Sequence, residues 1–153
     1  MAVTITAERP DDPDAAVLIL ELETHLAEYY APESRHGFSV ERLVTEDVPF
    51  FLLRDDGEPA GCGGIKIFDE QPAYGELKRM YVRPQFRGRG YGRLILDHLA
   101  EYAHGHGITL LRLETGIYQE AAIRMYEAAG FRRIPPFGPY TDDPVSLCYE
   151  RQI

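Results

Sequence analysis

The chain alternates between short apolar runs with a two-residue period and longer segments in which apolar residues recur every three or four positions. The first pattern predicts half-buried strands, and the second predicts amphipathic helices. The predicted strands are Val3–Glu8, Pro49–Arg54, Ala60–Phe68, Tyr74–Val82, Thr109–Glu114, Phe131–Ile134 and Val145–Arg151. The predicted helices run from Pro13 to near Pro32, from Ser39 to about Thr45, from Tyr91 to about Gly105 and from Glu120 to Ala129.

Local signals support several of these boundaries. Asp12 before Pro13 is typical of an N-cap followed by proline in the first turn of a helix. The segment Asp55-Asp56-Gly57-Glu58 predicts a hairpin between two strands. The buried face predicted for the third helix contains Tyr91, Leu94, Ile95, His98, Leu99 and Tyr102.

A basic, glycine-rich loop follows the strand Tyr74–Val82 and leads into the third helix. Its glycines let backbone N–H groups approach a ligand closely, and the helix N-terminus adds unpaired N–H groups and a positive dipole end. The loop also contains planar cationic donors that suit phosphate oxygens, namely Arg83, Arg87, Arg89 and Arg93. We therefore expect a phosphate or pyrophosphate site here, with a solvated basic loop as the alternative.

The glycine spacing excludes two common nucleotide-binding loops. Gly88, Gly90 and Gly92 form G-x-G-x-G, which differs from the G-x-G-x-x-G of dinucleotide folds, and no Gly-Lys-Ser/Thr of a Walker loop occurs. Arg87, Gly90 and Gly92 do fit R/Q-x-x-G-x-G/A. Together with the preceding Glu-Leu-Lys-Arg-Met-Tyr-Val, this loop resembles the acyl-CoA site of the GNAT superfamily of N-acetyltransferases.

A second motif extends the resemblance. Residues 119–131 are similar to the family pattern N-x-x-A-x-x-x-Y-x-x-x-G-F. The matching residues are Ala122, Tyr126, Gly130 and Phe131, and Gln119 stands where the family has asparagine. The resemblance implies an α/β fold with a mixed, mostly antiparallel central sheet, helices on both faces and a splayed pair of parallel strands. By resemblance, these two strands are Tyr74–Val82 and Thr109–Glu114.

The resemblance also implies a site for acetyl-CoA as acyl donor. Backbone groups of Met80 and Val82 would bind the pantetheine arm as an added strand would, and Arg87–Gly92 would hold the pyrophosphate. The residues expected at the cofactor are Met80, Tyr81, Val82, Arg87, Gly88, Arg89, Gly90, Tyr91, Gly92, Arg93, Gln119, Ala122 and Met125. No metal is expected, since His104 and His106 suit a helix end, where cations complement the dipole.

Transfer from a thioester to an amine needs an acid for the leaving thiolate and a base for the amine. By resemblance, Tyr126 is the expected acid, because a phenol with a pKa of about 10 stays protonated at neutral pH. Tyr126 also suits a core position on an amphipathic helix. Glu76 is the expected base and Glu114 is its rival, while a solvated position at a strand end is the alternative for either carboxylate.

The acceptor site is expected in the segments outside the motifs. The residues expected there are Tyr29, Tyr30, Phe38, Lys78 and Tyr140, and the same segments contain His36 and Asp143. Arg35 with Lys78 or Arg79 suits an acceptor carboxylate, and packing of loops against the sheet is the alternative for any one of these residues. We expect a small primary amine or an amino-acid-like metabolite as acceptor. The alternatives are a peptide N-terminus or lysine, another acyl donor, or a non-catalytic acyl-CoA-binding regulatory module.

Composition agrees with an acetyltransferase domain covering residues 1–153. The chain has 153 residues and a net charge of −9, which argues against nucleic acid as a partner. No apolar run reaches the length of a membrane span, so no membrane association is expected. Cys62 and Cys148 are expected to be free thiols in a cytoplasmic protein. A homodimer is compatible with all of these features.

Overall fold

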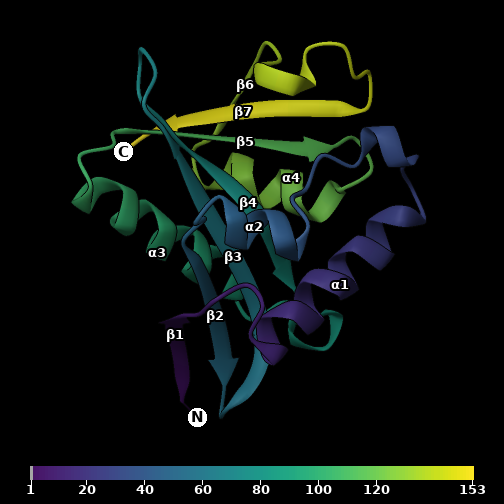
Figure 1. Cartoon of the computed structure of the whole chain (residues 1–153), viewed down its shortest axis with the longest axis vertical. Coiled ribbons are helices and arrows are strands. Elements are labelled where there is room, and N and C mark those ends of the chain that lie inside the picture. The colour runs from purple at the N-terminus through teal and green to yellow at the C-terminus, as the bar shows by residue number, and fades with distance from the viewer. Residues whose placement is uncertain (1) are drawn as a thin grey trace.

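In a computed structural model that describes residues 2–153, seven strands form one sheet in the order β1-β2-β3-β4-β5-β7-β6 (Figure 1). The strands are β1 (Val3–Ala7), β2 (Phe50–Asp55), β3 (Glu58–Phe68), β4 (Tyr74–Val82), β5 (Leu110–Gly116), β6 (Arg132–Ile134) and β7 (Ser146–Gln152). The helices are α1 (Pro13–Ala27), α2 (Val40–Thr45), α3 (Tyr91–Gly105) and α4 (Glu120–Ala128), with short 3₁₀ helices η1 (Pro32–Ser34), η2 (Pro84–Phe86) and η3 (Gly138–Tyr140). Neighbouring strands are antiparallel except for β4 and β5, which are parallel. The predicted fold class is therefore confirmed.

Helices cover both faces of the sheet, so that it separates two apolar clusters (Figure 1). Leu18 of α1 and Leu43 of α2 pack on one face. Ile95 and Leu99 of α3 pack on the other face, together with Tyr126 of α4. Among residues 2–153, no helix is both long and apolar enough to cross a bilayer.

The local predictions are confirmed with small differences. The turn between β2 and β3 has positive φ angles at Asp56 (50°) and Gly57 (85°), as a type I′ hairpin turn requires. The placement of Leu94 on the buried face of α3 was wrong, because its side chain is 44% exposed while Leu96 is fully buried. Tyr91, Ile95 and Leu99 form the buried face of α3 in either case. Whether the residue before or after Ile95 is also buried depends on how the helix packs on the sheet.

The pairing of β4 with β5 covers only their first residues. The partners are Gly75 with Leu111 and Glu76 with Arg112. Beyond Glu76 the two strands separate, so the remaining backbone of β4 has no strand partner on that side. The backbone N–H and C=O groups on the unpaired side of β4 are therefore free to form hydrogen bonds with a ligand.

A bulge in β4 lies beside this separation. Cys62 pairs with Tyr81 and Gly64 pairs with Lys78, so two residues of β4 lie opposite the single residue Gly63. One of these two, Arg79, has a φ of +54°, a left-handed conformation that is costly for a bulky side chain. Bulges of this kind re-aim side chains and often lie next to functional sites.

Candidate active site

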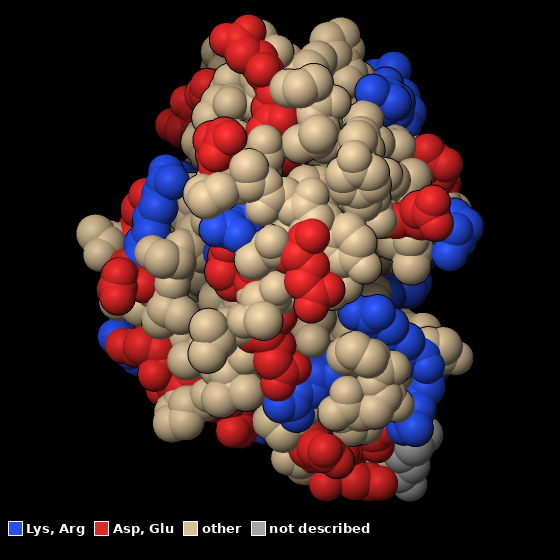
Figure 2. Space-filling model, turned by 90° about the vertical axis from the view of Figure 1, so that its right-hand side faces the viewer, with Lys and Arg blue, Asp and Glu red and all other residues tan. Residues whose placement is uncertain are grey.

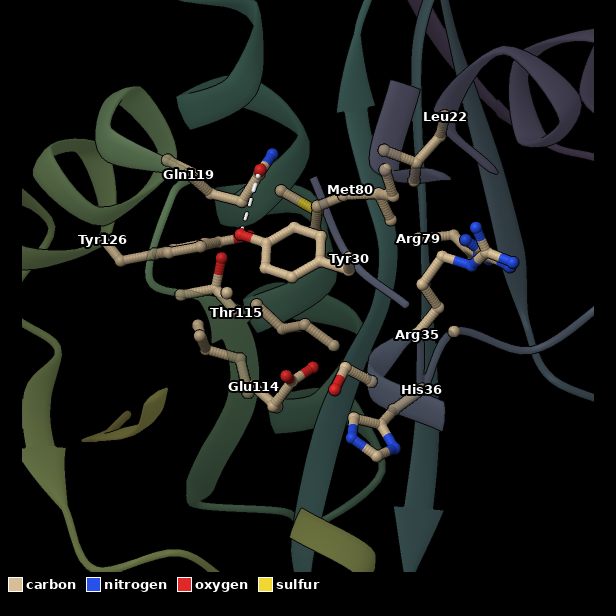
Figure 3. A pocket seen from close by; sticks show the side chains of 17 residues that line it. Leu22, Tyr30, Arg35, His36, Arg79, Met80, Glu114, Thr115, Gln119 and Tyr126 are labelled. Atoms are coloured by element: carbon tan, nitrogen blue, oxygen red, sulfur yellow. Dashed lines mark hydrogen bonds between the residues drawn. The ribbon is translucent and has the colours of Figure 1, made fainter. Parts of the chain in front are cut away.

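A pocket of about 120 Å³ lies where β4 and β5 separate (Figure 3). Met80 lines it from β4, Glu114 and Thr115 line it from β5, and Tyr126 lines it from α4. Leu22 of α1 and the segment between α1 and α2, with Tyr30, form the remaining wall. The strand separation therefore creates a small site whose walls come from five different parts of the chain.

Tyr126 contributes a buried phenol to this pocket. Its side chain is 5% exposed and also contacts the ring of Phe131 in an edge-on arrangement. Burial raises the pKa of the Tyr126 phenol above its usual value, and the nearby Glu114 raises it further. Tyr126 is thus protonated at neutral pH, as a proton donor must be, and its raised pKa makes it a weaker acid than an exposed phenol.

Tyr30 closes one end of the pocket next to the start of α4. Its hydroxyl donates to Gln119 Oε1 at 3.2 Å, the dashed line in Figure 3, and accepts from the Tyr118 N–H at 3.0 Å. Gly116 allows this approach, because a Cβ there would lie only 2.0 Å from the Tyr30 hydroxyl oxygen. The structure thereby joins Tyr30, predicted at the acceptor, to Gln119, predicted at the cofactor.

Glu114 is a carboxylate on the pocket wall. Ser146 Oγ donates to Glu114 Oε2 at 2.7 Å, which orients the group. Burial raises the pKa of Glu114 above its ordinary value, since the hydrogen bond from Ser146 only partly offsets the cost of desolvating the charge. A carboxylate with a raised pKa is a stronger base than an exposed one once it is ionised.

Glu76 has a different environment, although it is close in space to Glu114. It is 3% exposed, and its Oε2 accepts from Lys78 Nζ at 2.8 Å and from the Tyr140 hydroxyl at 2.5 Å. Lys78 Nζ also donates to the Tyr140 hydroxyl at 3.0 Å and lies 4.1 Å from the centre of the Phe38 ring. Burial lowers the pKa of Lys78, outweighing the attraction of Glu76.

The buried group Glu76, Lys78 and Tyr140 does not line the pocket. Its polar atoms bond to one another, so Glu76 has less capacity to accept a proton from a substrate than Glu114 has. Phe38 is likewise buried, at 5% exposed. Glu114 therefore lines the pocket, whereas Glu76, Lys78, Phe38 and Tyr140 are buried outside its lining.

Replacing Tyr140 by phenylalanine tests what this buried group contributes to stability. The ring stays, but Glu76 loses a donor and Lys78 loses an acceptor within a buried cluster. We expect the free energy of unfolding to fall by about 2 kcal/mol, as for a hydrogen bond to a buried charged group. Urea denaturation measures the change, and Tyr29→Phe, at a 51% exposed position, is the control that should leave stability unchanged.

The predicted phosphate loop has the conformation that its glycines suggest. Gly88 and Gly90 have φ angles of +81° and +80°, and Gly90 is the N-cap of α3. Gly92 lies in the first turn of α3. The unpaired N–H groups of this helix end open to an exposed loop, as an anion site requires.

The arginines of the loop differ in their partners. Arg83 pairs with Glu21 at 2.6 Å, Arg89 pairs with Asp55 at 2.9 Å, and Arg93 pairs with Asp97 at 3.1 Å. Arg87 instead donates its Nε to the carbonyl of Val82 at 3.1 Å and is exposed. Basic and acidic side chains accordingly lie side by side on the face that Figure 2 shows. Arg87 is the loop arginine with the most freedom to bind an anion.

The remaining predicted cofactor residues differ in exposure. Ala122 lines the pocket, whereas Met125 and Val82 are partly buried against the apolar cluster on the α3 side. The side chains of Tyr81 and Tyr91 are 9% and 4% exposed, so only their backbone groups are available to a ligand in this conformation. Tyr29 points away from the pocket's lining as an exposed residue.

Two residues that sequence analysis did not single out hold the site together. Asp55 is 6% exposed and accepts from both Arg89 and the Tyr91 hydroxyl, so it fixes the loop to the β2–β3 hairpin. Ser146 orients Glu114. The hairpin signal at Asp55 was visible in the sequence, but its contact with a loop 34 residues away was not.

Comparison with known proteins identifies the family. The profile of the Acetyltransferase (GNAT) family matches residues 17–131. The chain belongs to the GNAT family. It is 40% identical over 151 residues to an IAA acetyltransferase of Azospirillum brasilense, covering 99% of this chain and 98% of that protein.

Two solved structures extend the comparison. A Klebsiella pneumoniae protein described as an acyl-CoA N-acyltransferase is 32% identical, with a TM-score of 0.82 over 98% of this chain and 97% of the other. The N-acetylglutamate synthase of Neisseria gonorrhoeae, solved with coenzyme A and N-acetyl-glutamate, is 27% identical, with a TM-score of 0.78 over 99% of this chain and 35% of the other. This GNAT protein is therefore an acyl-CoA-dependent N-acetyltransferase, as its sequence predicted.

Proposed function

We propose that this GNAT protein transfers the acetyl group of acetyl-CoA directly to the primary amine of a small, amino-acid-like molecule. The observation that carries the proposal is the pocket between β4 and β5, with the protonated Tyr126 phenol and the Glu114 carboxylate on its walls. A pocket of about 120 Å³ suits a small acceptor better than a folded protein.

Acetyl-CoA would enter along the free edge of β4. The backbone beyond Glu76 has no partner in β5, which supports strand-like hydrogen bonds to a pantetheine arm. The loop with Arg87, Gly88 and Gly90 would bind the pyrophosphate at the N-terminus of α3. The binding of coenzyme A by the N-acetylglutamate synthase relative supports this cofactor.

The chemistry then needs two proton transfers on opposite sides of the reacting carbon. The amine nitrogen attacks the thioester carbon, and Glu114 takes the proton released as the C–N bond forms. The C–S bond breaks, and Tyr126 donates its proton to the departing thiolate. The proton on Glu114 then returns through solvent to the Tyr126 phenolate, so both groups regain their starting states. Both groups face one pocket, which supports their acting on the same tetrahedral intermediate.

The charges at the pocket support an acceptor that contains a carboxylate next to its amine. Arg35 Nε lies 3.0 Å from one oxygen of Glu23, and Arg79 lies 2.8 Å from the other. Both arginines line the pocket, and they share a single carboxylate, so one positive charge lacks a partner of its own there. A carboxylate next to the acceptor amine would supply that partner.

The acceptor class is tested by free-thiol release from acetyl-CoA with matched pairs of amines. Each pair joins an α-amino acid to its decarboxylated amine, such as phenylalanine with 2-phenylethylamine. We expect saturable turnover with a higher kcat/KM for the amino acid of the preferred pair, and loss of that preference in Arg35→Gln. Acetylation of lysine peptides with no turnover of free amines would contradict the proposal.

The cofactor loop is tested by two variants. Arg87→Ala removes a phosphate donor, and Gly90→Val forces a β-branched residue into a φ of +80°. We expect each change to weaken acetyl-CoA binding about tenfold or more, as loss of a charge-assisted hydrogen bond implies. Calorimetry measures the affinity, with Arg132→Ala at a 73% exposed side chain as control. Undiminished affinity in both variants would remove the loop from the cofactor site.

A further inference from the structure

A histidine–carboxylate pair joins the two segments on the acceptor side of the pocket. His36 follows η1 and Asp143 precedes β7, 107 positions later, yet His36 Nε2 lies 2.7 Å from Asp143 Oδ2. The His36 and Asp143 side chains are only 17% and 9% exposed. Figure 3 shows His36 on the pocket wall beside Glu114.

Asp143 determines which nitrogen of His36 carries a proton. Desolvation tends to raise the pKa of Asp143, but the hydrogen bonds from His36 and from the Val145 N–H outweigh it, and the pKa is lowered. Asp143 is thus an ionised carboxylate that can only accept. Nε2 of His36 must donate to it, so Nδ1 of the neutral ring carries a lone pair and is the basic atom.

We propose that His36, oriented by Asp143, accepts the proton that the acceptor ammonium must lose before it can attack acetyl-CoA. This inference rests on the proposed function, since it adds a base to the same pocket. An amine at neutral pH is mostly R–NH₃⁺ and has no lone pair. Nδ1 takes one proton and leaves R–NH₂, and the imidazolium then releases that proton to water.

The second nitrogen proton belongs to Glu114. It leaves as the C–N bond forms, while Tyr126 protonates the thiolate, so two bases handle two protons. Once the proton on Glu114 has passed through solvent to the Tyr126 phenolate, the overall balance is one proton released to solvent through His36 and one retained on the thiol of coenzyme A. Each of the three proton transfers thus has its own side chain, and the reaction needs no reactant besides the amine and acetyl-CoA.

The groups around His36 suit a ring that becomes positively charged. Asp143 contacts it from the loop before β7, and Glu114 on β5 is close enough that a charge on His36 lowers the pKa of Glu114. Tyr140 presents its ring edge-on, with the ring centres 5.0 Å apart. The neighbouring Arg35 is paired with Glu23. A positive charge on His36 is therefore stabilised by two carboxylates.

The test is the pH dependence of kcat/KM for His36→Gln and Asp143→Asn, using the preferred amine of the acceptor panel. At about pH 7 we expect a loss of about tenfold for His36→Gln, since water and buffer replace part of its role. The loss should shrink toward none above the pKa of the amine, where free R–NH₂ already dominates. Added imidazole should restore activity to His36→Gln. His104→Gln, at an exposed position on α3, is the control.

A second measurement does not require turnover. Nitrogen–proton NMR of the histidine rings should show His36 as the Nε2–H tautomer, with the signal altered in Asp143→Asn and absent in His36→Gln. An Nδ1–H tautomer, or a loss of kcat/KM that is equal at every pH and insensitive to imidazole, would overturn the inference alone. If the wild-type protein acetylates no free amine, the proposed function fails, and the inference fails with it.

Discussion

Replacing Glu114 by glutamine is expected to lower kcat/KM about 10³-fold, within the range for loss of a general base. Glutamine preserves the shape and can still accept from Ser146, so the change removes basicity with little effect on packing. Acetyl-CoA affinity should be retained, because Glu114 lies on the opposite wall from β4. Steady-state rates at varied amine concentration measure the effect.

Glu76→Gln is the matched comparison. It removes a carboxylate from the buried group with Lys78 and Tyr140 and leaves the lysine without its counter-ion. We expect it to reduce the free energy of unfolding by about 3 kcal/mol, the cost of breaking a buried ion pair. The folded fraction should keep more activity than Glu114→Gln keeps. The reverse order of activities would restore the original prediction that Glu76 is the base.

The raised pKa of Glu114 also predicts the pH dependence. A base works only when ionised, so activity should fall as the pH drops through a pKa above the ordinary glutamate value. Linkage gives the sign for stability. Folding favours the protonated form of Glu114, so its contribution is lost as the pH rises through the folded-state pKa. Glu114→Gln should therefore raise the melting temperature at neutral pH and remove the contribution of Glu114 to the acid limb of the rate profile, leaving the contributions of the acceptor amine and of His36.

Replacing Tyr126 by phenylalanine is expected to lower kcat about 10²-fold with acetyl-CoA affinity unchanged. The substitution removes one hydroxyl from a ring that is already packed in the core, so the fold should be preserved. Because burial raises the pKa of Tyr126, its protonation should not limit the rate of the wild-type protein on the alkaline side.

The control for this variant is Tyr149→Phe. The Tyr149 ring is 2% exposed, and its hydroxyl donates to Glu127 at 2.9 Å, away from the lining of the pocket. It should have a wild-type rate. Equal rates for Tyr126→Phe and wild type, measured by thiol release under saturating acetyl-CoA, would remove Tyr126 from the mechanism.

The helices and strands were predictable because each depends on local periodicity. The hairpin was predictable because its turn needs positive φ angles, which Asp56 and Gly57 adopt readily. The separation of β4 from β5 came only from the family resemblance. Nothing in either strand's own pattern marks the point where pairing stops after Glu76. Strand pairing is a long-range property, and local alternation does not specify it.

The alternation of apolar and polar residues along β4 also did not show whether Glu76 or Glu114 would line the pocket. Side chains along β4 should face the same way at every second residue, yet Leu77 packs on the α3 side and Tyr81 on the α1 side. The bulge at Arg79 exchanges the two faces. A left-handed arginine has no signature in a sequence, so the face occupied by the residues of β4 after Arg79 could not be assigned in advance.

The pairing of His36 with Asp143 is a contact between two loops that the sequence did not predict either. Both residues were expected in the acceptor segments, but their separation of 107 positions gave no sign that they meet. The contact depends on how two irregular segments cross over the sheet. Such contacts follow from the whole tertiary structure and not from the motifs.

A crystal structure of the protein with bound coenzyme A would show whether the thioester lies between the separated strands β4 and β5, where we propose that acetyl transfer occurs. We expect the pantetheine arm along the free edge of β4, the pyrophosphate at Gly88 and Gly90, and the thiol within hydrogen-bond distance of the Tyr126 hydroxyl. Coenzyme A bound elsewhere, or with its thiol remote from both Tyr126 and Glu114, would contradict this proposal.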